Sequence, residues 1–175
     1  MRQRFSDAGG GFFDTPSDGE SLLIRPKDLQ DNATPSGNAL ACEALLTLAA
    51  FADDPPYHDA TEQAIRLIAD STLRHPLGFA RWLSNADSIL ENGKQIAVVW
   101  DAKGKEERDL IRFIRSRNEP NAVVAAAAFP PPLNAPALLM NRPLQNDTTT
   151  VYFCRHFVCK QPVNSIEELK KNDVS

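Results

Sequence analysis

The hydrophobic pattern of this 175-residue chain changes its period near Gly93. Before Gly93, apolar residues recur at the spacing of amphipathic helices in three segments. These predicted helices cover residues 38–52, 57–73 and 78–90. After Gly93, residues 95–100 and 122–129 form short apolar runs, which are typical of strands covered on both faces. The pattern therefore predicts a helical region over residues 1–92 and a small α/β region over residues 93–175.

Short connections join the predicted elements. Residues 53–56, Asp-Asp-Pro-Pro, end the first helix, and so short a link predicts an antiparallel helical hairpin with the second. In the second region an amphipathic helix over residues 105–117 separates the two apolar runs, which predicts a right-handed βαβ unit. A third strand is expected over residues 149–154. A terminal helix over residues 165–171 completes the predicted order.

Composition and charge exclude several classes of protein. Hydrophobic residues make up 42% of the chain, which is enough for a folded core. The formal net charge of −4 argues against a nucleic-acid binder, which needs a basic surface. No apolar run approaches the roughly 20 residues that cross a bilayer, so no membrane partner is expected. The first five residues lack the apolar stretch of a secretion signal, and there are three cysteines. The chain is therefore predicted to be cytoplasmic.

Two loop motifs precede the first predicted helix. Residues 9–15 read Gly-Gly-Gly-Phe-Phe-Asp-Thr, and residues 31–38 read Asp-Asn-Ala-Thr-Pro-Ser-Gly-Asn. With Arg25-Pro26-Lys27 between them, they are the strongest points at which the chain resembles the C-terminal part of the spermatogenesis-associated thioredoxin-domain proteins. Weaker points are His75-Pro76, the predicted strand pair and the tail from Tyr152 to Leu169, so that the resemblance covers nearly the whole chain.

The resemblance implies a mainly α fold in which helices of a partial α/α six-hairpin (toroid) barrel precede a βαβ-containing C-terminal unit. Several sugar epimerases and glycosidases have that barrel architecture. Family members are far longer, with an N-terminal thioredoxin-like domain, and this chain corresponds to their closing segment. The thioredoxin-type cysteine motif lies outside these residues. Whether the chain is an enzyme stays open. The N-terminal half of the same family, or self-association, is the expected partner, since incomplete hairpins leave apolar faces uncovered.

The first loop motif offers a pocket wall for a sugar-like small molecule. Phe12 and Phe13 would cover apolar sugar faces, Gly10 would contribute to the same pocket, and Asp14 would act as acid, base or hydroxyl acceptor. The alternative is a glycine turn in which the two rings plug the end of the barrel and Asp14 caps a turn.

The second loop motif combines polar groups with a helix N-terminus. Unpaired N–H groups there offer a polar floor for a ligand, beside Asp31, Ser36 and Asn38. Ser36 is also a good N-cap for the helix that follows, and the alternative is that Asp31 and Ser36 only satisfy backbone groups. Asp14 and Asp31, with Glu20 as a further acid, are candidates for general acid–base chemistry, which needs two carboxyl groups roughly 5–10 Å apart.

Histidines and cysteines give weaker signals. His58 and His75 are expected in hairpin loops, although epimerases of the implied architecture use histidines as acid and base. Cys154 and Cys159 lack the second pair that a structural zinc site needs, and strand alternation points them to opposite faces unless a turn intervenes. Packing is therefore the expected role of this pair, with a redox role as the alternative. No metal and no cofactor are predicted.

Two functions follow from the sequence. The first is a carbohydrate-binding or carbohydrate-processing part of a six-hairpin-barrel protein. In that case Asp14 and Asp31 would be catalytic, and Gly10, Phe12, Phe13, Ser36 and Asn38 would bind the ligand. The second is a non-catalytic structural or interaction module that completes a larger protein.

Overall fold

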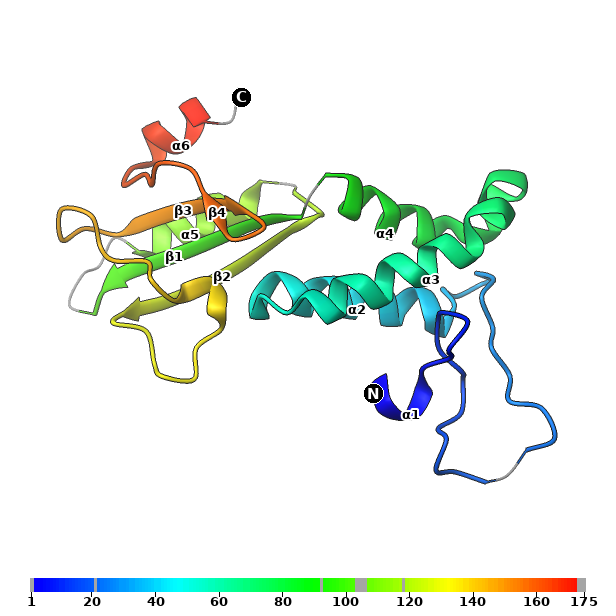
Figure 1. Cartoon of the computed structure of the whole chain (residues 1–175). Helices are drawn as coiled ribbons and strands as arrows, with labels where there is room; N and C mark the ends of the chain where they lie inside the picture. Colours follow the sequence, from blue (N-terminus) through cyan, green and yellow to red (C-terminus); the bar gives the residue numbers. More distant parts are fainter. Residues whose placement is uncertain (1, 21, 92, 103–106, 118, 173–175) are drawn as a thin grey trace. The chain divides into compact units, whose positions relative to one another are not determined.

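The computed structural model describes residues 2–20, 22–91, 93–102, 107–117 and 119–172 (Figure 1). The chain forms two compact units. The first comprises residues 1–49 and 54–90, and the second comprises residues 50–53 and 91–175. Each unit has its own buried core.

The first unit is helical. Its elements are α1 (Arg2–Phe5), α2 (Gly37–Ala52), α3 (Pro55–Arg74), the 3-10 helix η1 (Pro76–Phe79) and α4 (Ala80–Leu90). The three predicted helices are confirmed, with differences where two of them begin. α3 begins at Pro55 and not at residue 57, and α4 begins at Ala80 and not at residue 78, because residues 76–79 form η1. Pro55 and Pro56 follow the end of α2, as predicted, and they also form the first two positions of α3. Proline is tolerated there because the N–H that it lacks has no acceptor within the first turn of a helix.

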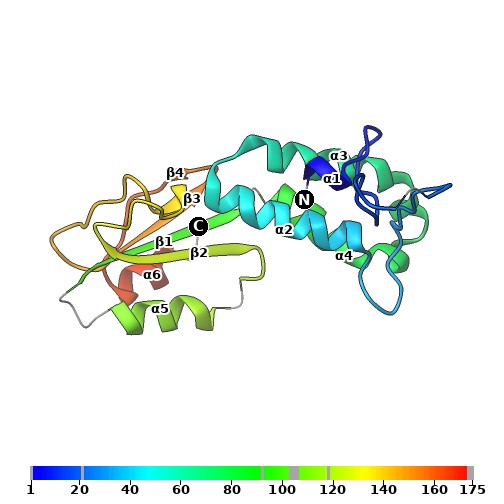
Figure 2. The same ribbon diagram turned by 90° about the horizontal axis from the view of Figure 1, so that it is seen from below.

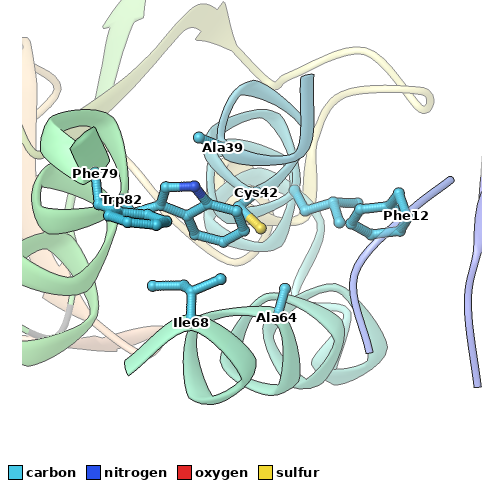
Figure 3. Close-up of a cluster of buried hydrophobic side chains, with 8 residues drawn as sticks. Phe12, Ala39, Cys42, Ala64, Ile68, Phe79 and Trp82 are labelled. Carbon is cyan, nitrogen blue, oxygen red and sulfur yellow. The ribbon is translucent and has the colours of Figure 1, made fainter. Parts of the chain in front are cut away.

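The core of the first unit lies between α2, α3 and α4 (Figure 3). Trp82 of α4 is fully buried, and its indole N–H donates to the carbonyl of Leu29 at 2.7 Å. Cys42 of α2 and Ile68 of α3 pack in the same cluster. Phe12, from the N-terminal loop, joins them as a core residue. The loop before α2 is therefore part of this core.

The second unit is a mixed sheet with helices. Its elements are β1 (Lys94–Asp101), α5 (Glu107–Ser116), β2 (Ala122–Phe129), the 3-10 helix η2 (Ala137–Leu139), β3 (Thr150–Arg155), β4 (Val158–Cys159) and α6 (Ile166–Asn172). The strand order is β2-β1-β3-β4. β1 runs parallel to β2 and antiparallel to β3, which confirms the βαβ unit and places β2 at an edge.

Both faces of β1 are covered, which explains its continuous apolar run. Ile96 and Val98 face a cluster formed with α5 and α6, and Figure 2 shows these two helices on the same side of the sheet. Ala97 and Val99 face the opposite cluster, which contains η2 and Tyr152. Over the described residues, no helix combines the length and the apolar character that a bilayer crossing requires.

The expectation of a partial six-hairpin barrel is wrong. The described residues contain six α-helices and a four-stranded sheet. Instead of lining a ring of hairpins, α2, α3 and α4 close on one core of their own, with Phe12 as part of it. The large indole of Trp82 fills the space between the three helices, so their inward faces are already satisfied. The expected small α/β region is present.

Candidate functional site

The predicted site residues lie around the N-terminal loop of the first unit. Asn38, in the first turn of α2, is 1% exposed and contacts the loop through its carboxamide. Its Oδ1 accepts from the N–H of Phe12 at 2.7 Å, and its Nδ2 donates to the carbonyl of Phe12 at 2.8 Å. Nδ2 also donates to the carbonyl of Asp28 at 3.0 Å. The carboxamide thus pairs with the backbone as a neighbouring strand would.

Two glycines let the loop pass close to the helices. Gly11 has a φ of +73°, and a Cβ there would lie 3.0 Å from Oδ1 of Asn38. Gly10 has a φ of +96°, and a Cβ there would lie 3.3 Å from the carbonyl oxygen of Gln63 in α3. Both positions are buried. Gly10, predicted to contribute to a ligand pocket, permits close approach of the N-terminal loop to α3.

Phe12 and Phe13 have different surroundings. Phe12 is a core residue, whereas Phe13 is half-buried beneath the guanidinium of Arg25, whose Cζ lies 4.0 Å from the ring centroid. Arg25 also donates to the carbonyls of Arg4 and Thr15. One face of the Phe13 ring therefore already carries a cationic partner.

Lys27 connects the two sides of the glycine turn. Its ammonium lies 2.6 Å from Oδ2 of Asp7 and 2.9 Å from the carbonyl oxygen of Gly10. The hydrogen bond from Lys27, with a second from the N–H of Gly9, holds the pKa of the Asp7 carboxyl below its usual value. Arg25 and Lys27 stand out in the sequence only as points of family resemblance. Their spacing on either side of Pro26 holds no signal that they clamp this loop.

The two predicted catalytic acids are both hydrogen-bonded to the backbone. Asp14 is exposed, and its Oδ2 accepts from the N–H of Asp28 at 2.9 Å. Asp31 is buried, and its two carboxylate oxygens accept from the N–H groups of Ser36 and Arg81, each at 2.8 Å. Asp31 thus joins the start of α4 to the residue before α2.

Ser36 is the N-cap of α2, as its sequence position suggested. Its hydroxyl accepts from the N–H of Ala39 at 3.2 Å. The structure therefore brings the predicted residues into two local groups. Asn38 and Asp14 both hydrogen-bond Asp28, and Asn38 also binds Phe12. Asp31 and Ser36 instead stabilise the starts of two helices.

The two histidines lie at opposite ends of α3. His58 is in its first turn, and His75 follows its last residue. At 1.5 Å per residue along the helix, the step from His58 to His75 corresponds to about 25 Å. An acid–base pair made of these two histidines is excluded by that separation.

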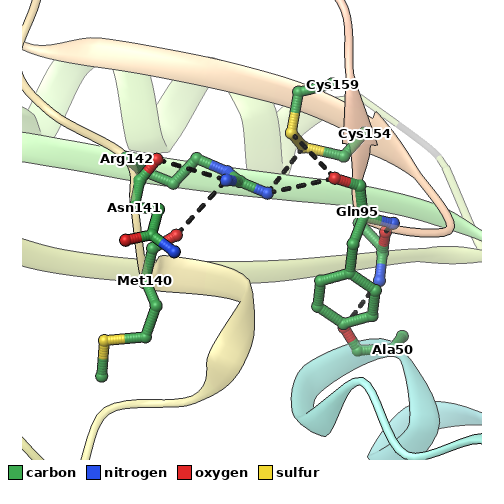
Figure 4. Close-up of a disulfide and its surroundings, with 8 residues drawn as sticks. Ala50, Gln95, Met140, Asn141, Arg142, Cys154 and Cys159 are labelled. Carbon is green, nitrogen blue, oxygen red and sulfur yellow. Dashed lines mark hydrogen bonds between the residues drawn. A yellow bond between two sulfur atoms is a disulfide. The ribbon is translucent and has the colours of Figure 1, made fainter.

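Cys154 and Cys159 form a disulfide, so the expectation of mere packing is wrong (Figure 4). The intervening residues His156 and Phe157 both adopt positive φ, of 47° and 61°. This turn reverses the chain into the β3–β4 hairpin, where the two cysteines are direct partners with Cα atoms 3.9 Å apart. Strand alternation, on which the expectation rested, does not apply across a turn.

The third cysteine is isolated in the core. Cys42 is fully buried, and this burial raises the pKa of its thiol to about 12. Among the residues that the structure describes, no three His, Cys, Asp or Glu side chains are grouped to hold a metal ion.

Comparison with known proteins finds several that are similar to this chain. The chain is 28% identical over 168 residues to spermatogenesis-associated protein 20 of Homo sapiens, and 27% identical over 168 residues to that of Mus musculus. An uncharacterized protein of Caenorhabditis elegans is 22% identical over 163 residues. Each alignment covers 93% of this chain. The chain is related to the spermatogenesis-associated protein 20 family.

The relationship to spermatogenesis-associated protein 20 extends over both units, because an alignment of this coverage includes residues of each. The chain spans about a fifth of the relatives' length, 21% for the human protein. No family model matches the chain.

Proposed function

We propose that this chain is a non-catalytic structural module that completes a larger protein of the spermatogenesis-associated protein 20 family. The partner is the part of the protein that corresponds to the remaining four fifths of the relatives. The cytoplasmic location expected from the sequence belongs to this proposal.

The observation that carries the proposal is the outer face of α2. The inner face, with Asn38, Cys42 and Leu45, is buried in the core of the first unit. The opposite face presents Leu40 and Leu48, which are 44% and 46% exposed, with Ala44 between them. These three residues follow each other at intervals of four and form one stripe.

A helix that is apolar around its whole circumference is normally buried on all sides. Glu43 is the one charged residue among the sixteen of α2. A partner that covers the stripe of Leu40, Ala44 and Leu48 needs an apolar face of its own, on a helix or on a sheet. The unmatched length of the relatives, about four fifths of the human protein, is the nearest source of such a face.

A second exposed apolar segment belongs to the same unit. Leu22, Leu23 and Ile24 are exposed together, and Leu23 is 105% exposed. The loop that bears them is fixed at its base, because Arg25 binds two backbone carbonyls and stacks on Phe13. A fixed base with an apolar tip suits attachment to a partner surface.

Carbohydrate binding is favoured less by the geometry. The carboxylate oxygens of Asp31 and the carboxamide of Asn38 are occupied by backbone partners. A sugar would have to replace those hydrogen bonds, which costs the desolvation of each buried group left behind.

Co-purification tests the proposal. This chain and the remaining part of the protein from the same source would be expressed as two separate chains. We expect a stable complex on size exclusion, lost in the double variant Leu40→Glu, Leu48→Glu. Ala69→Glu, at an exposed position of α3, is the matched control and should keep the complex. Two parts that stay apart, self-association of this chain through α2, or monosaccharide binding by this chain alone would contradict the proposal.

A further inference from the structure

The disulfide of the second unit has chemically different surroundings at its two sulfur atoms (Figure 4). Cys154 is 2% exposed and lies on β3, one of the inner strands of the sheet. Cys159 is partly exposed and lies on the short edge strand β4, next to the exposed Val158. An incoming molecule therefore reaches the sulfur of Cys159 more readily than that of Cys154.

A cation lies beside the buried sulfur. Nη2 of Arg142 is 4.0 Å from Sγ of Cys154, whereas the atom near Sγ of Cys159 is the carbonyl oxygen of Phe157, at 3.7 Å. A guanidinium stabilises a thiolate, and a carbonyl oxygen does not. Of the two sulfur atoms, that of Cys154 is therefore the better leaving group.

The guanidinium of Arg142 has carbonyl partners and no carboxylate. It donates to the carbonyls of Met140, Asn141 and Phe157, each at 3.3 Å, and its buried Nε has no hydrogen-bond acceptor. Among the described residues, no Asp or Glu forms an ion pair with it. A half-buried cation without an anion is costly, and a thiolate at Cys154 would supply the missing charge.

We propose that Cys154 and Cys159 form a thiol–disulfide exchange site whose co-substrates are thiols. A thiolate of the first co-substrate attacks Sγ of Cys159. A bond forms between these two sulfur atoms, the bond between Cys154 and Cys159 breaks, and Cys154 leaves as a thiolate beside Arg142. A second thiolate then attacks the co-substrate's sulfur in the mixed disulfide, which breaks its bond to Cys159 and releases Cys159 as a thiolate. Two electrons pass from two thiols to the protein, which gives the dithiol and a small-molecule or protein disulfide.

The exchange would change more than the two sulfur atoms. The N–H of Phe157, in the turn between the cysteines, donates to Oε1 of Gln95 at 2.8 Å. Nε2 of the same Gln95 donates to the carbonyl of Ala50, also at 2.8 Å. The oxidation state of the hairpin is therefore linked through one buried carboxamide to residues 50–53 of this unit.

Titration with glutathione tests the exchange. The whole chain would be equilibrated with mixtures of reduced and oxidised glutathione, quenched with N-ethylmaleimide and analysed by mass spectrometry. We expect reversible conversion between no labels and two labels on the native protein. A pair that stays oxidised in reduced glutathione alone, or a pair that never forms a bond in oxidised glutathione, would overturn the proposal.

Trapping the intermediate tests which sulfur is attacked. Trypsin cleaves after Arg155 and Lys160, so it separates Cys154 from Cys159 once the bond is open. Early quenching should give glutathione on the peptide of residues 156–160 and maleimide on Cys154. Glutathione on Cys154 would refute the assignment.

Substitution of Arg142 tests its role as a positioning residue. Arg142→Gln should slow reduction by about tenfold, because the leaving thiolate loses its cation. Arg142→Lys should restore part of the rate. Arg155→Gln, with the same charge change beside Cys154 on an exposed side chain, is the matched control and should react at the original rate. Equal reduction rates for Arg142→Gln and this control would show that Arg142 has no role in the exchange.

Discussion

Asn38 and Phe12 are paired through both backbone groups of Phe12, although 26 residues separate them in the chain. The carboxamide accepts from the N–H and donates to the carbonyl, as the backbone of a neighbouring strand would. The pairing places the Phe12 ring in the core that also contains Trp82. The N-terminal loop is thereby fixed to α2 at one residue.

Asn38→Ala should lower the free energy of unfolding of the first unit by about 3 kcal/mol. The substitution leaves two buried groups of Phe12 and the carbonyl of Asp28 without a partner, at about 1 kcal/mol or more each. Urea unfolding followed by the fluorescence of Trp82, in a Trp100→Phe background, measures it. Asn32→Ala, on an exposed residue of the same loop, should stay within about 0.5 kcal/mol of the parent. Equal midpoints for the two variants would refute the pairing as a source of stability.

Gly11→Ala should destabilise the same unit by about 2 kcal/mol. The positive φ of 73° strains an L-residue, and the new Cβ would meet Oδ1 of Asn38 at 3.0 Å. Gly37→Ala is the matched control, because a Cβ there meets nothing within 4 Å. In the first turn of α2, alanine should be neutral or stabilising by up to about 1 kcal/mol. Thermal unfolding compares them, and a lower Tm for Gly37→Ala than for Gly11→Ala would contradict this account.

Asp31→Ala should cost about 2 kcal/mol of stability, because two backbone N–H groups at the starts of α2 and α4 lose their acceptor. Asp31→Asn should recover part of the loss, since its single carbonyl oxygen accepts one of the two bonds. Denaturant midpoints test this order. Asp18→Ala, which breaks an exposed ion pair with Arg4, serves as the control and should cost at most about 0.5 kcal/mol. An unchanged midpoint in Asp31→Ala would contradict the structural role of Asp31, which would then again be a candidate for a functional role.

Glu119 should make the stability of the second unit depend on pH. Burial raises the pKa of its carboxyl, but the ion pairs with Lys94 and Arg117, at 2.5 and 2.6 Å, outweigh burial and lower it. A carboxyl whose pKa is lower in the folded state stabilises the protein fully above its unfolded value, near 4.5, and loses that contribution as the pH falls through the folded value.

Glu119→Gln should therefore cost about 1 kcal/mol at pH 7, and the difference from the parent should shrink below about pH 4.5. Urea unfolding followed by Trp100 fluorescence at several pH values measures it. Glu167→Gln, on an exposed position of α6, is the control and should show little difference across the same range. A cost for Glu119→Gln that grows on acidification would reverse the sign and refute the argument.

Cys42 should resist alkylation in the native protein. With a pKa of about 12, roughly one thiol in ten thousand is a thiolate at pH 8, and the side chain is fully buried. Iodoacetamide at pH 8 should leave Cys42 unmodified until urea is added, when it should react completely. The denatured sample is the control, and rapid labelling of the native protein would show that α2 is not packed as described.

Local pattern predicted the elements well and the long-range contacts poorly. Apolar residues are spaced at helical intervals in α2, α3 and α4, and they form a continuous run in β1. Both patterns arise from burial of residues that are near each other in the chain, so they can be identified from the sequence. The closure of three helices on Trp82 depends on side-chain volume in three dimensions, which periodicity does not contain. The barrel expected from resemblance was wrong for that reason.

The site shows the same division. The N-cap role of Ser36 was foreseen because it depends on adjacent residues. The partner of Asn38 lies 26 residues away, and the partner of Asp31 in α4 lies 50 residues away, so neither could be identified from spacing. The disulfide was missed because His156 and Phe157 adopt positive φ without a glycine to signal the turn.

Strand β2 contains only Ala, Val and Phe, and among the described strands it pairs with β1 alone. Its outer margin has neither a charge nor a proline to deter a further strand. Molecules that meet there can extend one another's sheets, as in the early stages of amyloid growth. Fibrils seeded by residues 122–129 are therefore the characteristic misassembly to expect of this chain at high concentration, and a lysine on that margin is the simplest way to prevent them.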